Sequence, residues 1–340
     1  MKKIDLEKVA KDLGVSKTLV SLVLNNKGDK YGISAKTQKE VFEKAKELNY
    51  KPNLIARGLR TGKSNIIGLI VADISNPFYA KISRSIEYSA SRKGYNLIIC
   101  SSEENDKKEQ ELIEILIKGQ NADGVIVSST QNTAKLFNEL QAENKPFVLI
   151  DRYIPKLKCN YVTVDNYKGA FELTEHLISS GYKNIAMLTI SPHFISSVHD
   201  RVNGYKDALK KHGIGFNKKN LREIPFNNIP ALVEQELKDL VSGKTPIDAL
   251  FVVNNNLAVY CFETINKLGL KIPKDIALTC FDDLDMFKFS DPPITAVAQP
   301  VEEIGEKAFE LLLSLMNSKN SPPENKEIVL ATELKIRKSC

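Results

Sequence analysis

The chain has 340 residues, of which 42% are hydrophobic and 26% charged, so it is too long for one comfortable core and has the composition of a globular protein with two or three domains. The formal net charge is +6, but residues 1–63 hold 15 Lys and Arg against 7 Asp and Glu (+8), and the other 277 residues hold 33 against 35 (−2). A basic segment on a neutral body predicts a nucleic-acid-binding head.

The cysteines and the apolar runs argue against several other classes of protein. The five cysteines include no C-x-x-C pair, which disfavours a structural zinc site or a disulfide framework. No apolar run reaches the roughly 20 residues of a membrane span, and Asp5 and Glu7 interrupt the apolar core that a signal peptide needs. We therefore expect a cytoplasmic protein without a metal, a cofactor or a membrane partner.

Three short helices are predicted in residues 1–49. Apolar residues at helical spacing define the first helix, Gly14 ends it, and Ser16 and Ser34 are candidate N-caps of the next two. The helices are expected at about residues 6–13, 17–24 and 35–48. Two short helices joined by a tight turn with a glycine describe a helix-turn-helix, and the third should close a small core with apolar residues that include Phe42. An ordinary helical hairpin is the alternative, which the basic charge disfavours.

The second helix offers candidate DNA contacts. If it enters a major groove, its early outward positions meet base edges. Those positions are Lys17, Thr18 and Leu22, and Ser16 and Ser21 are placed for phosphates. Lys can donate to guanine, Thr can hydrogen-bond or touch a thymine methyl group, and Leu offers only apolar contact.

Residues 50–64, YKPNLIARGLRTGKS, separate this head from the rest of the chain. Pro52 suits the first turn of a helix, but Gly58 and Gly62 weaken that helix. We expect a marginal hinge helix, followed by a linker, that folds only when both sides are engaged.

From residue 65 onward, apolar strands alternate with amphipathic helices, which predicts an α/β body of two doubly wound lobes. The first lobe is expected to comprise residues 65–163 and 291–323, and the second residues 164–290 and 324–340. In this scheme the segment 295–300 and the helix 301–317 return to the first lobe, and EIVLATELKIRKSC adds a closing strand pair. The cleft between the lobes should lie at the carboxyl ends of the strands.

The head and the start of the body carry recognisable motifs. They are LEKVAKDLGVSKTLVSLVLNN, the S-x-K-T at residues 34–37, and LNYKPNLIARGLRTGKSNIIGLIV. On these motifs the chain resembles the lactose/purine-repressor (LacI) family of bacterial transcriptional regulators, and its body is similar to periplasmic sugar-binding proteins. The resemblance implies a ligand-responsive repressor of carbohydrate-utilisation genes. It also implies a homodimer that binds a palindromic double-stranded DNA operator and takes a small sugar-like effector in its cleft.

The resemblance assigns DNA contacts as well. Residues 17, 18 and 22 become the base-reading positions, and Leu59 on the hinge helix wedges between base pairs in the minor groove. The implied DNA-binding residues are Leu6, Ser16, Lys17, Thr18, Ser21, Leu22, Asn25, Asn53, Ala56, Arg57 and Leu59. The family commonly has Arg where this chain has Leu22, so the operator half-site should differ from the common one.

Polar and aromatic residues at the strand ends are expected to line the cleft. Carboxylates, amides and guanidinium groups can form paired hydrogen bonds with neighbouring sugar hydroxyls, and aromatic rings can stack on the apolar face of a sugar. The candidates are Asp73, Asn76, Phe78, Tyr79, Asp151, Arg152, Arg201, Asn255, Asp282 and Gln299. Phe78 could instead be core packing, Arg201 could pair with a neighbouring acid, and Asp165 is better explained as a helix cap. Asn255 stands where the family usually has Asp, which favours a ligand with an acceptor group, such as a sugar acid, or a different sugar.

Two rival classes of function remain. Doubly wound sheets host many enzymes, but the sequence has no G-x-x-x-x-G-K-[ST], G-x-S-x-G or H-E-x-x-H motif, so we expect no enzyme. A transport-type binding protein is the third class, and the basic head argues against it.

Overall fold

The structure is a computed structural model, and the chain divides into two units, residues 1–64 and 65–340. The described residues are 5–50, 63–192, 194–226, 228–243, 245–318 and 324–340. Four of the predicted DNA contacts, Asn53, Ala56, Arg57 and Leu59, and with them the predicted hinge helix, lie outside the described residues.

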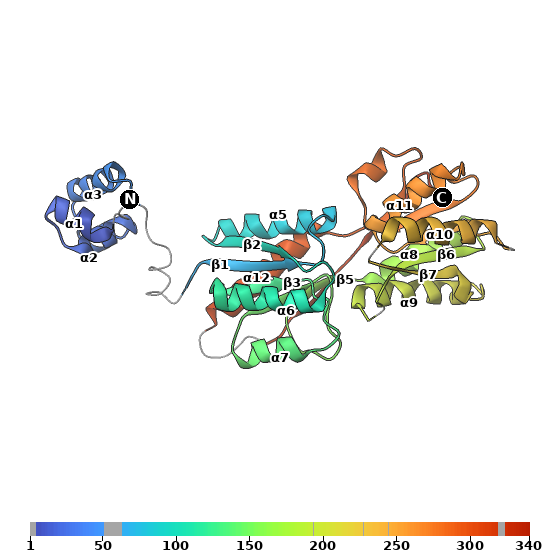
Figure 1. The fold of residues 1–340 in the computed structure, drawn as a ribbon, viewed down its shortest axis with the longest axis horizontal. Coiled ribbons are helices and arrows are strands. Elements are labelled where there is room, and N and C mark those ends of the chain that lie inside the picture. The colour runs from blue at the N-terminus through green and yellow to red at the C-terminus, as the bar shows by residue number, and fades with distance from the viewer. Residues whose placement is uncertain (1–4, 51–62, 193, 227, 244, 319–323) are drawn as a thin grey trace. The chain divides into compact units, whose positions relative to one another are not determined.

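The first unit is the predicted helix-turn-helix head (Figure 1). Its elements are α1 (Leu6–Leu13), α2 (Lys17–Leu24), the 3₁₀ turn η1 (Asp29–Tyr31) and α3 (Ala35–Glu47). The side chains of Asp5, Ser16 and Ser34 cap the three α-helices by accepting a backbone N–H of the first turn. Gly14 ends α1 with φ +65°, a left-handed conformation that glycine adopts without strain.

The core of the head is formed by apolar residues of all three α-helices. Its buried members are Val9, Ala10, Val20, Val23, Val41 and Ala45. The prediction that Phe42 joins this core is wrong, because the side chain is 43% exposed. Val41 and Ala45, four positions apart, define the inward face of α3, and Phe42 lies about 100° around the helix from Val41.

The first sheet of the body is parallel throughout, in the order β11-β5-β4-β3-β1-β2. Its strands are β1 (Ile66–Val71), β2 (Asn96–Ser101), β3 (Gly124–Val127), β4 (Phe147–Ile150), β5 (Tyr161–Val164) and β11 (Glu327–Leu330). Its helices are α5 (Pro77–Ser91), α6 (Asp106–Glu114), the π-helical turn η2 (Ile115–Gly119), α7 (Lys135–Ala142) and α12 (Val301–Asn317).

Successive residues of β1 show that both faces of this sheet are covered. Leu69 and Val71 join the cluster that includes residues of α5 and α12, whereas Ile70 between them joins the cluster of α6 and α7. Because successive side chains of a strand point to opposite faces, a sheet covered on both sides needs a continuous apolar run. This explains why the strand sequence IIGLIV does not alternate.

The second sheet has the order β12-β10-β9-β8-β6-β7 and is parallel except for β12, which runs antiparallel to β10. Its strands are β6 (Ile185–Ser191), β7 (Leu221–Pro225), β8 (Ala249–Val252), β9 (Ala277–Phe281), β10 (Thr295–Ala298) and β12 (Glu333–Lys335). Its helices are α8 (Asn166–Ser179), α9 (Ser196–Lys211), α10 (Ile229–Ser242) and α11 (Asn255–Lys267), with the 3₁₀ turns η3 (Lys218–Asn220) and η4 (Asp285–Lys288). Helix α8 packs against α9, and α10 against α11 (Figure 1).

The predicted division of the lobes near the C-terminus is wrong in two places. Residues 295–298, expected in the first lobe, form β10 of the second sheet, paired with β9. Residues 327–330, expected in the second lobe, form β11 of the first sheet, paired with β5. EIVL and ELK therefore do not pair as a hairpin, because the two residues between them carry the chain from one sheet to the other. Short apolar segments do not specify which sheet they join, and this ambiguity caused both errors.

Candidate functional site: a polar cavity between two lobes

A narrow cavity of about 40 Å³ lies where the carboxyl ends of strands from both sheets meet. Eight of the ten predicted cleft residues line it: Asp73, Asn76, Phe78, Tyr79, Asp151, Arg152, Arg201 and Asp282. Residues from β1, β4, β6 and β9 or the turns after them therefore converge, as the doubly wound topology requires.

The first-lobe wall is a buried polar network. The hydroxyl of Tyr79 donates to Oδ2 of Asp151 at 2.9 Å and lies 2.9 Å from Oγ of Ser128. Arg152 donates two hydrogen bonds to the carboxylate of Glu104, at 2.7 and 2.6 Å, and its Nε lies 3.3 Å from Oδ2 of Asp151. Burial raises the pKa of Tyr79 well above its ordinary value, so Tyr79 remains a neutral hydrogen-bond donor.

The charge on Arg152 is stabilised by its partners. Burial alone would lower the pKa of this guanidinium, but its neighbours, Glu104 first among them, together outweigh burial and raise the pKa well above its ordinary value. Sequence reasoning missed Glu104, because it lies three residues beyond the end of β2, in a turn rather than at the strand end.

The second-lobe wall is built on Arg201 of α9. Its Nε donates to Oδ1 of Asn166 and its Nη1 to the carbonyl of Val253, both at 2.8 Å. The guanidinium carbon lies 3.7 Å from the centroid of the Phe281 ring, a cation–π contact. Oδ2 of Asp282 is 3.9 Å from Nη1. Burial raises the pKa of Asp282, although Arg201 acts in the opposite direction.

Close packing of α8 against α9 sets the position of Arg201. A Cβ atom added to Gly204 would lie 2.3 Å from the carbonyl oxygen of Tyr167, so only glycine permits this approach. Asp165 caps α8 through the N–H of Lys168 at 2.9 Å, as its position in the sequence predicted.

Asn255 and Gln299 do not line this cavity. Asn255 has no exposed surface, and its Nδ2 donates across the lobes to Oδ1 of Asn76 at 2.7 Å. Gln299 donates to Oδ1 of Asp282 and so orients a carboxylate that does line the cavity. That amide is used between the lobes in this structure, so its contacts do not support the expectation of an acceptor-bearing ligand, which stays a prediction.

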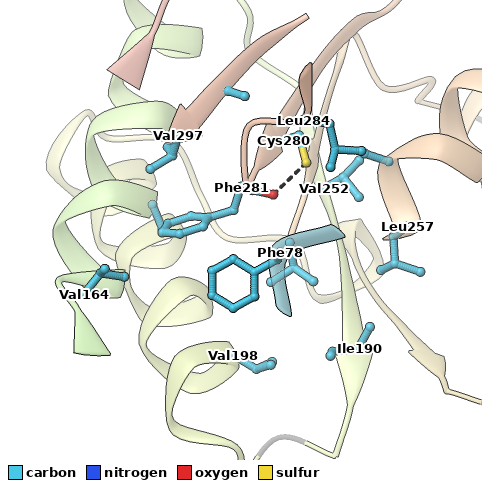
Figure 2. Close-up of a cluster of buried hydrophobic side chains, with 14 of the residues drawn as sticks. Phe78, Val164, Ile190, Val198, Val252, Leu257, Cys280, Phe281, Leu284 and Val297 are labelled. Carbon is cyan, nitrogen blue, oxygen red and sulfur yellow. Dashed lines mark hydrogen bonds between the residues drawn. The ribbon is translucent and has the colours of Figure 1, made fainter. Parts of the chain in front are cut away.

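Phe78 joins the lobes through apolar contact (Figure 2). It belongs to α5 of the first lobe, yet Figure 2 shows its ring among second-lobe side chains, which include Ile190, Val198 and Phe281. Phe78 is only 7% exposed and also lines the cavity. It is therefore both a core residue and a wall of the site.

Polar contacts also cross between the lobes. Tyr153 donates its backbone N–H to Oγ of Ser196 at 2.8 Å and its hydroxyl to Asp200 at 3.2 Å. Burial raises the pKa of Tyr153 to about 12, so the hydroxyl stays protonated. Further contacts are Asn256 Nδ2 to Asp73 Oδ2 at 3.3 Å and Lys81 to Asp285 at 2.8 Å.

Sequence reasoning missed several other residues of the cavity wall. They are Ile190, Ser197, Val198, Phe226, Ile229, Val253, Asn254 and Asn256. Most are apolar or lie in the first turn of a helix, and their residue types do not distinguish them from core or capping residues. Only Asn254 and Asn256, in the run NNN after β8, could have been predicted, because they are polar residues that follow a buried strand.

The head presents part of the predicted DNA-binding set on its surface. Ser16, Lys17 and Thr18 are exposed, whereas Leu6, Ser21, Leu22 and Asn25 are half-buried. Nζ of Lys17 lies 3.7 Å from a carboxylate oxygen of Glu7, but both side chains are well exposed, and such a pair is weak enough to exchange partners. Asn25 donates its side-chain amide to the carbonyl of Ser21 at 2.6 Å.

Two features bear on metals and membranes. Within the described ranges, no three His, Cys, Asp or Glu side chains gather closely enough to hold a metal ion. Among the helices that the structure describes, none combines the length and the apolar character of a membrane span.

Two family models match the chain. The model described as "Bacterial regulatory proteins, lacI family" matches residues 5–53, and the model described as "Periplasmic binding protein-like domain" matches residues 174–340. The first match covers the head and the second covers most of the second lobe together with the C-terminal segments of the body.

Relatives match over nearly the whole length. The chain is 31% identical over 334 residues to the HTH-type transcriptional regulator DegA of Bacillus subtilis (strain 168), a match that covers 97% of this chain and 96% of that protein. It is 30% identical over 331 residues to the ribose operon repressor of Halalkalibacterium halodurans, covering 97% and 95%.

Solved structures share the fold. A LacI family transcriptional regulator from Enterococcus faecium with bound ribose is 26% identical, with a TM-score of 0.69 over 81% of this chain and 98% of that one. The lac repressor dimer bound to operator and the anti-inducer ONPF is 24% identical, with a TM-score of 0.84 over 99% of each chain.

Proposed function

Because this chain belongs to the lacI family of bacterial regulatory proteins, we propose that it is a repressor of carbohydrate-utilisation genes whose operator affinity is set by a sugar effector. Membership of the family makes it a DNA-binding transcriptional regulator rather than an enzyme. In this proposal it acts in the cytoplasm as a homodimer and binds a palindromic operator.

One observation carries the proposal. The chain that bears a capped helix-turn-helix also bears a polar cavity between two lobes. Carboxylates, guanidinium groups and aromatic rings line the cavity, and this combination suits hydroxyl-rich ligands. The ribose operon repressor among the relatives and the ribose-bound Enterococcus structure support a sugar as the effector class.

The DNA-binding half of the proposal depends on α2. Lys17 and Thr18 lie exposed in its first turn, where a recognition helix contacts base edges in the major groove. Leu22 adds apolar contact one turn later, and Asn53, Ala56, Arg57 and Leu59 complete the contacts through the hinge helix in the minor groove.

Operator selection from random DNA tests this half. We expect a palindromic site whose affinity falls with salt, because Lys and Arg displace counterions from phosphates. Lys17→Ala should lower specific affinity by about 1–3 kcal/mol, whereas Lys46→Ala, at the exposed C-terminal end of α3, should have little effect. Equal affinity for every sequence would overturn the proposal.

Thermal-shift screening against sugars tests the effector half. A ligand at 100 times its Kd stabilises the folded protein by about 2.7 kcal/mol, which raises Tm by several degrees. Asp282→Ala should abolish the shift, and Asp239→Ala, at an exposed position of α10, should preserve it. A shift that survives Asp282→Ala would place the effector elsewhere.

A further inference from the structure

The cavity carries more negative than positive side chains. Four carboxylates, from Asp73, Glu104, Asp151 and Asp282, face two guanidinium groups, from Arg152 and Arg201, giving a formal charge of 2 − 4 = −2 among the described lining residues. An anionic group entering this space would add a like charge where little water remains to screen it.

The positive charge of Arg152 is already neutralised. Its guanidinium and the carboxylate of Glu104 form a two-pronged pair at 2.7 and 2.6 Å, and both side chains are at most 10% exposed. A two-pronged charge-assisted pair is among the strongest polar contacts in proteins. An anionic ligand would have to replace Glu104 in it and leave that carboxylate buried without its cation.

The guanidinium group of Arg201 is also already paired with protein groups. Its hydrogen bonds to Asn166 and Val253 hold the guanidinium plane over the Phe281 ring, with Asp282 at 3.9 Å. The carboxylate of Asp282 would repel any anion attracted to this guanidinium group. Neither guanidinium group therefore offers an unopposed positive charge to a ligand.

The turn that holds Glu104 is strained. Glu103 and Glu104 have φ of +55° and +53°, the left-handed region that residues other than glycine and asparagine rarely occupy. The N–H of Glu104 donates to the carbonyl of Ala72 at 3.3 Å, which fixes the turn beside β1. Strain of this kind concentrates at ligand-binding positions, and here it places a carboxylate on Arg152.

From these observations we propose that Glu104 is a specificity-determining residue that keeps acidic sugars out of the cavity, so that the effector is an uncharged or amino-substituted sugar. The inference rests on the proposed function, since it assumes that a sugar occupies this cavity. A hydroxyl can share the lone pairs of Asp151 and Asp282, and an ammonium group would offset part of the excess negative charge. The carboxylate of a uronate or the phosphate group of a sugar phosphate would do neither.

Matched sugars test the wild-type protein. Calorimetric titration would compare glucose, glucosamine and glucuronate, then galactose, galactosamine and galacturonate, then ribose and ribose 5-phosphate. Within the series that binds, we expect the acidic or phosphorylated member to bind at least about 100-fold more weakly than its best partner, because like charges in a desolvated site cost several kcal/mol. Equal or tighter binding of the acidic member would overturn the inference.

Variants at one position then assign the exclusion to Glu104. Glu104→Gln should bring the affinity for the acidic sugar at least about tenfold closer to that of its neutral partner, because it frees the positive charge of Arg152. Glu104→Asp keeps the charge and should keep the discrimination. Glu103→Gln, on the neighbouring exposed residue that pairs with Lys108 at 2.7 Å, is the matched control and should bind as the wild type does.

The outcomes separate the two proposals. Unchanged discrimination in a folded Glu104→Gln variant would overturn the role of Glu104. Binding of the acidic sugars to the wild type would overturn the effector class but leave the proposed sugar-responsive regulator in place. If no sugar of any charge bound, the proposed sugar effector would fail, and this inference would fail with it.

Discussion

The substitution Asn255→Asp tests how the two lobes close over the cavity. Nδ2 of Asn255 donates to Oδ1 of Asn76 at 2.7 Å, and that oxygen also accepts the backbone N–H of Phe78 at 3.0 Å. Oδ1 of Asn255 accepts the N–H of Asn256 at 2.9 Å, so the network fixes both amide orientations. An aspartate would set a carboxylate oxygen against the Asn76 oxygen at a fully buried position.

The size of the effect follows from two opposing contributions. Two buried acceptors facing each other without a hydrogen cost about 1–3 kcal/mol. A negative charge in the first turn of α11 offsets only about 0.3–1 kcal/mol through the helix dipole. Repulsion outweighs the dipole, and a net loss of about 1–2 kcal/mol in the closed form weakens effector binding roughly 5- to 30-fold.

Calorimetric titration of the effector into the wild type and the variant measures this loss. The free energy of unfolding of the effector-free protein, followed by its Tm, should change less than the free energy of effector binding. The reason is that the lobes can open and relieve the repulsion without unfolding. Asn266→Asp makes the same chemical change at an exposed position of α11 and should leave Kd unchanged. Unweakened binding by Asn255→Asp would refute the idea that this amide bridge closes the lobes.

Three further substitutions probe other parts of the chain. Gly204→Ala brings a Cβ within 2.3 Å of the Tyr167 carbonyl and should lower the free energy of unfolding, measured by urea denaturation, by about 1–3 kcal/mol or more. Gly215→Ala is the control, because a Cβ there meets nothing within 4 Å. Burial raises the pKa of Glu109, so the folded state holds this proton more tightly than the unfolded state. Its contribution to stability therefore grows as pH falls from neutral towards the unfolded value of about 4.3. Glu109→Gln should lose that pH dependence and, because an amide cannot accept all three hydrogen bonds of the carboxylate, melt lower at pH 7. Leu59→Ala should weaken operator binding in a mobility-shift assay by roughly tenfold or more, about 1.4 kcal/mol, with effector affinity almost unchanged; equal loss of both would make residues 50–64 only a linker.

Most of the fold could be predicted from sequence because the signals are local. Ser16 and Ser34 cap helices where their spacing predicted, and the apolar run of β1 required a sheet covered on both faces. The assignments of β10 and β11 failed because sheet membership depends on long-range pairing. A four-residue apolar segment satisfies either lobe equally well.

The residues of the site also differ in whether local sequence predicts them. Asp151 and Asp282 could be found because each follows a buried strand in a parallel sheet, and the topology brings strand ends together. Glu104 and Asn255 could not be interpreted, because their roles depend on partners 48 and 179 residues distant in sequence. The type of a residue limits which contacts it can make, but only the fold determines which partner lies within reach.

Among the described residues, the polar contacts between the lobes are few, and this determines how easily a small effector can switch the protein. Four cross-lobe hydrogen bonds, made by Asn255, Asn256 and Tyr153, contribute about 0.5–1.5 kcal/mol each. The exposed Lys81–Asp285 pair adds at most about 1 kcal/mol. Burial of the Phe78 ring among second-lobe side chains adds about 1.5–3 kcal/mol. Closure thus rests on several kcal/mol, offset by the ordering of both lobes. Moving a two-state equilibrium from 1:99 to 99:1 takes about 5.5 kcal/mol of differential binding, and a ligand with micromolar affinity has about 8.2 kcal/mol in total. A sugar that makes most of its contacts only in the closed form can therefore decide the state of the lobes, and a cavity walled by both lobes provides such contacts.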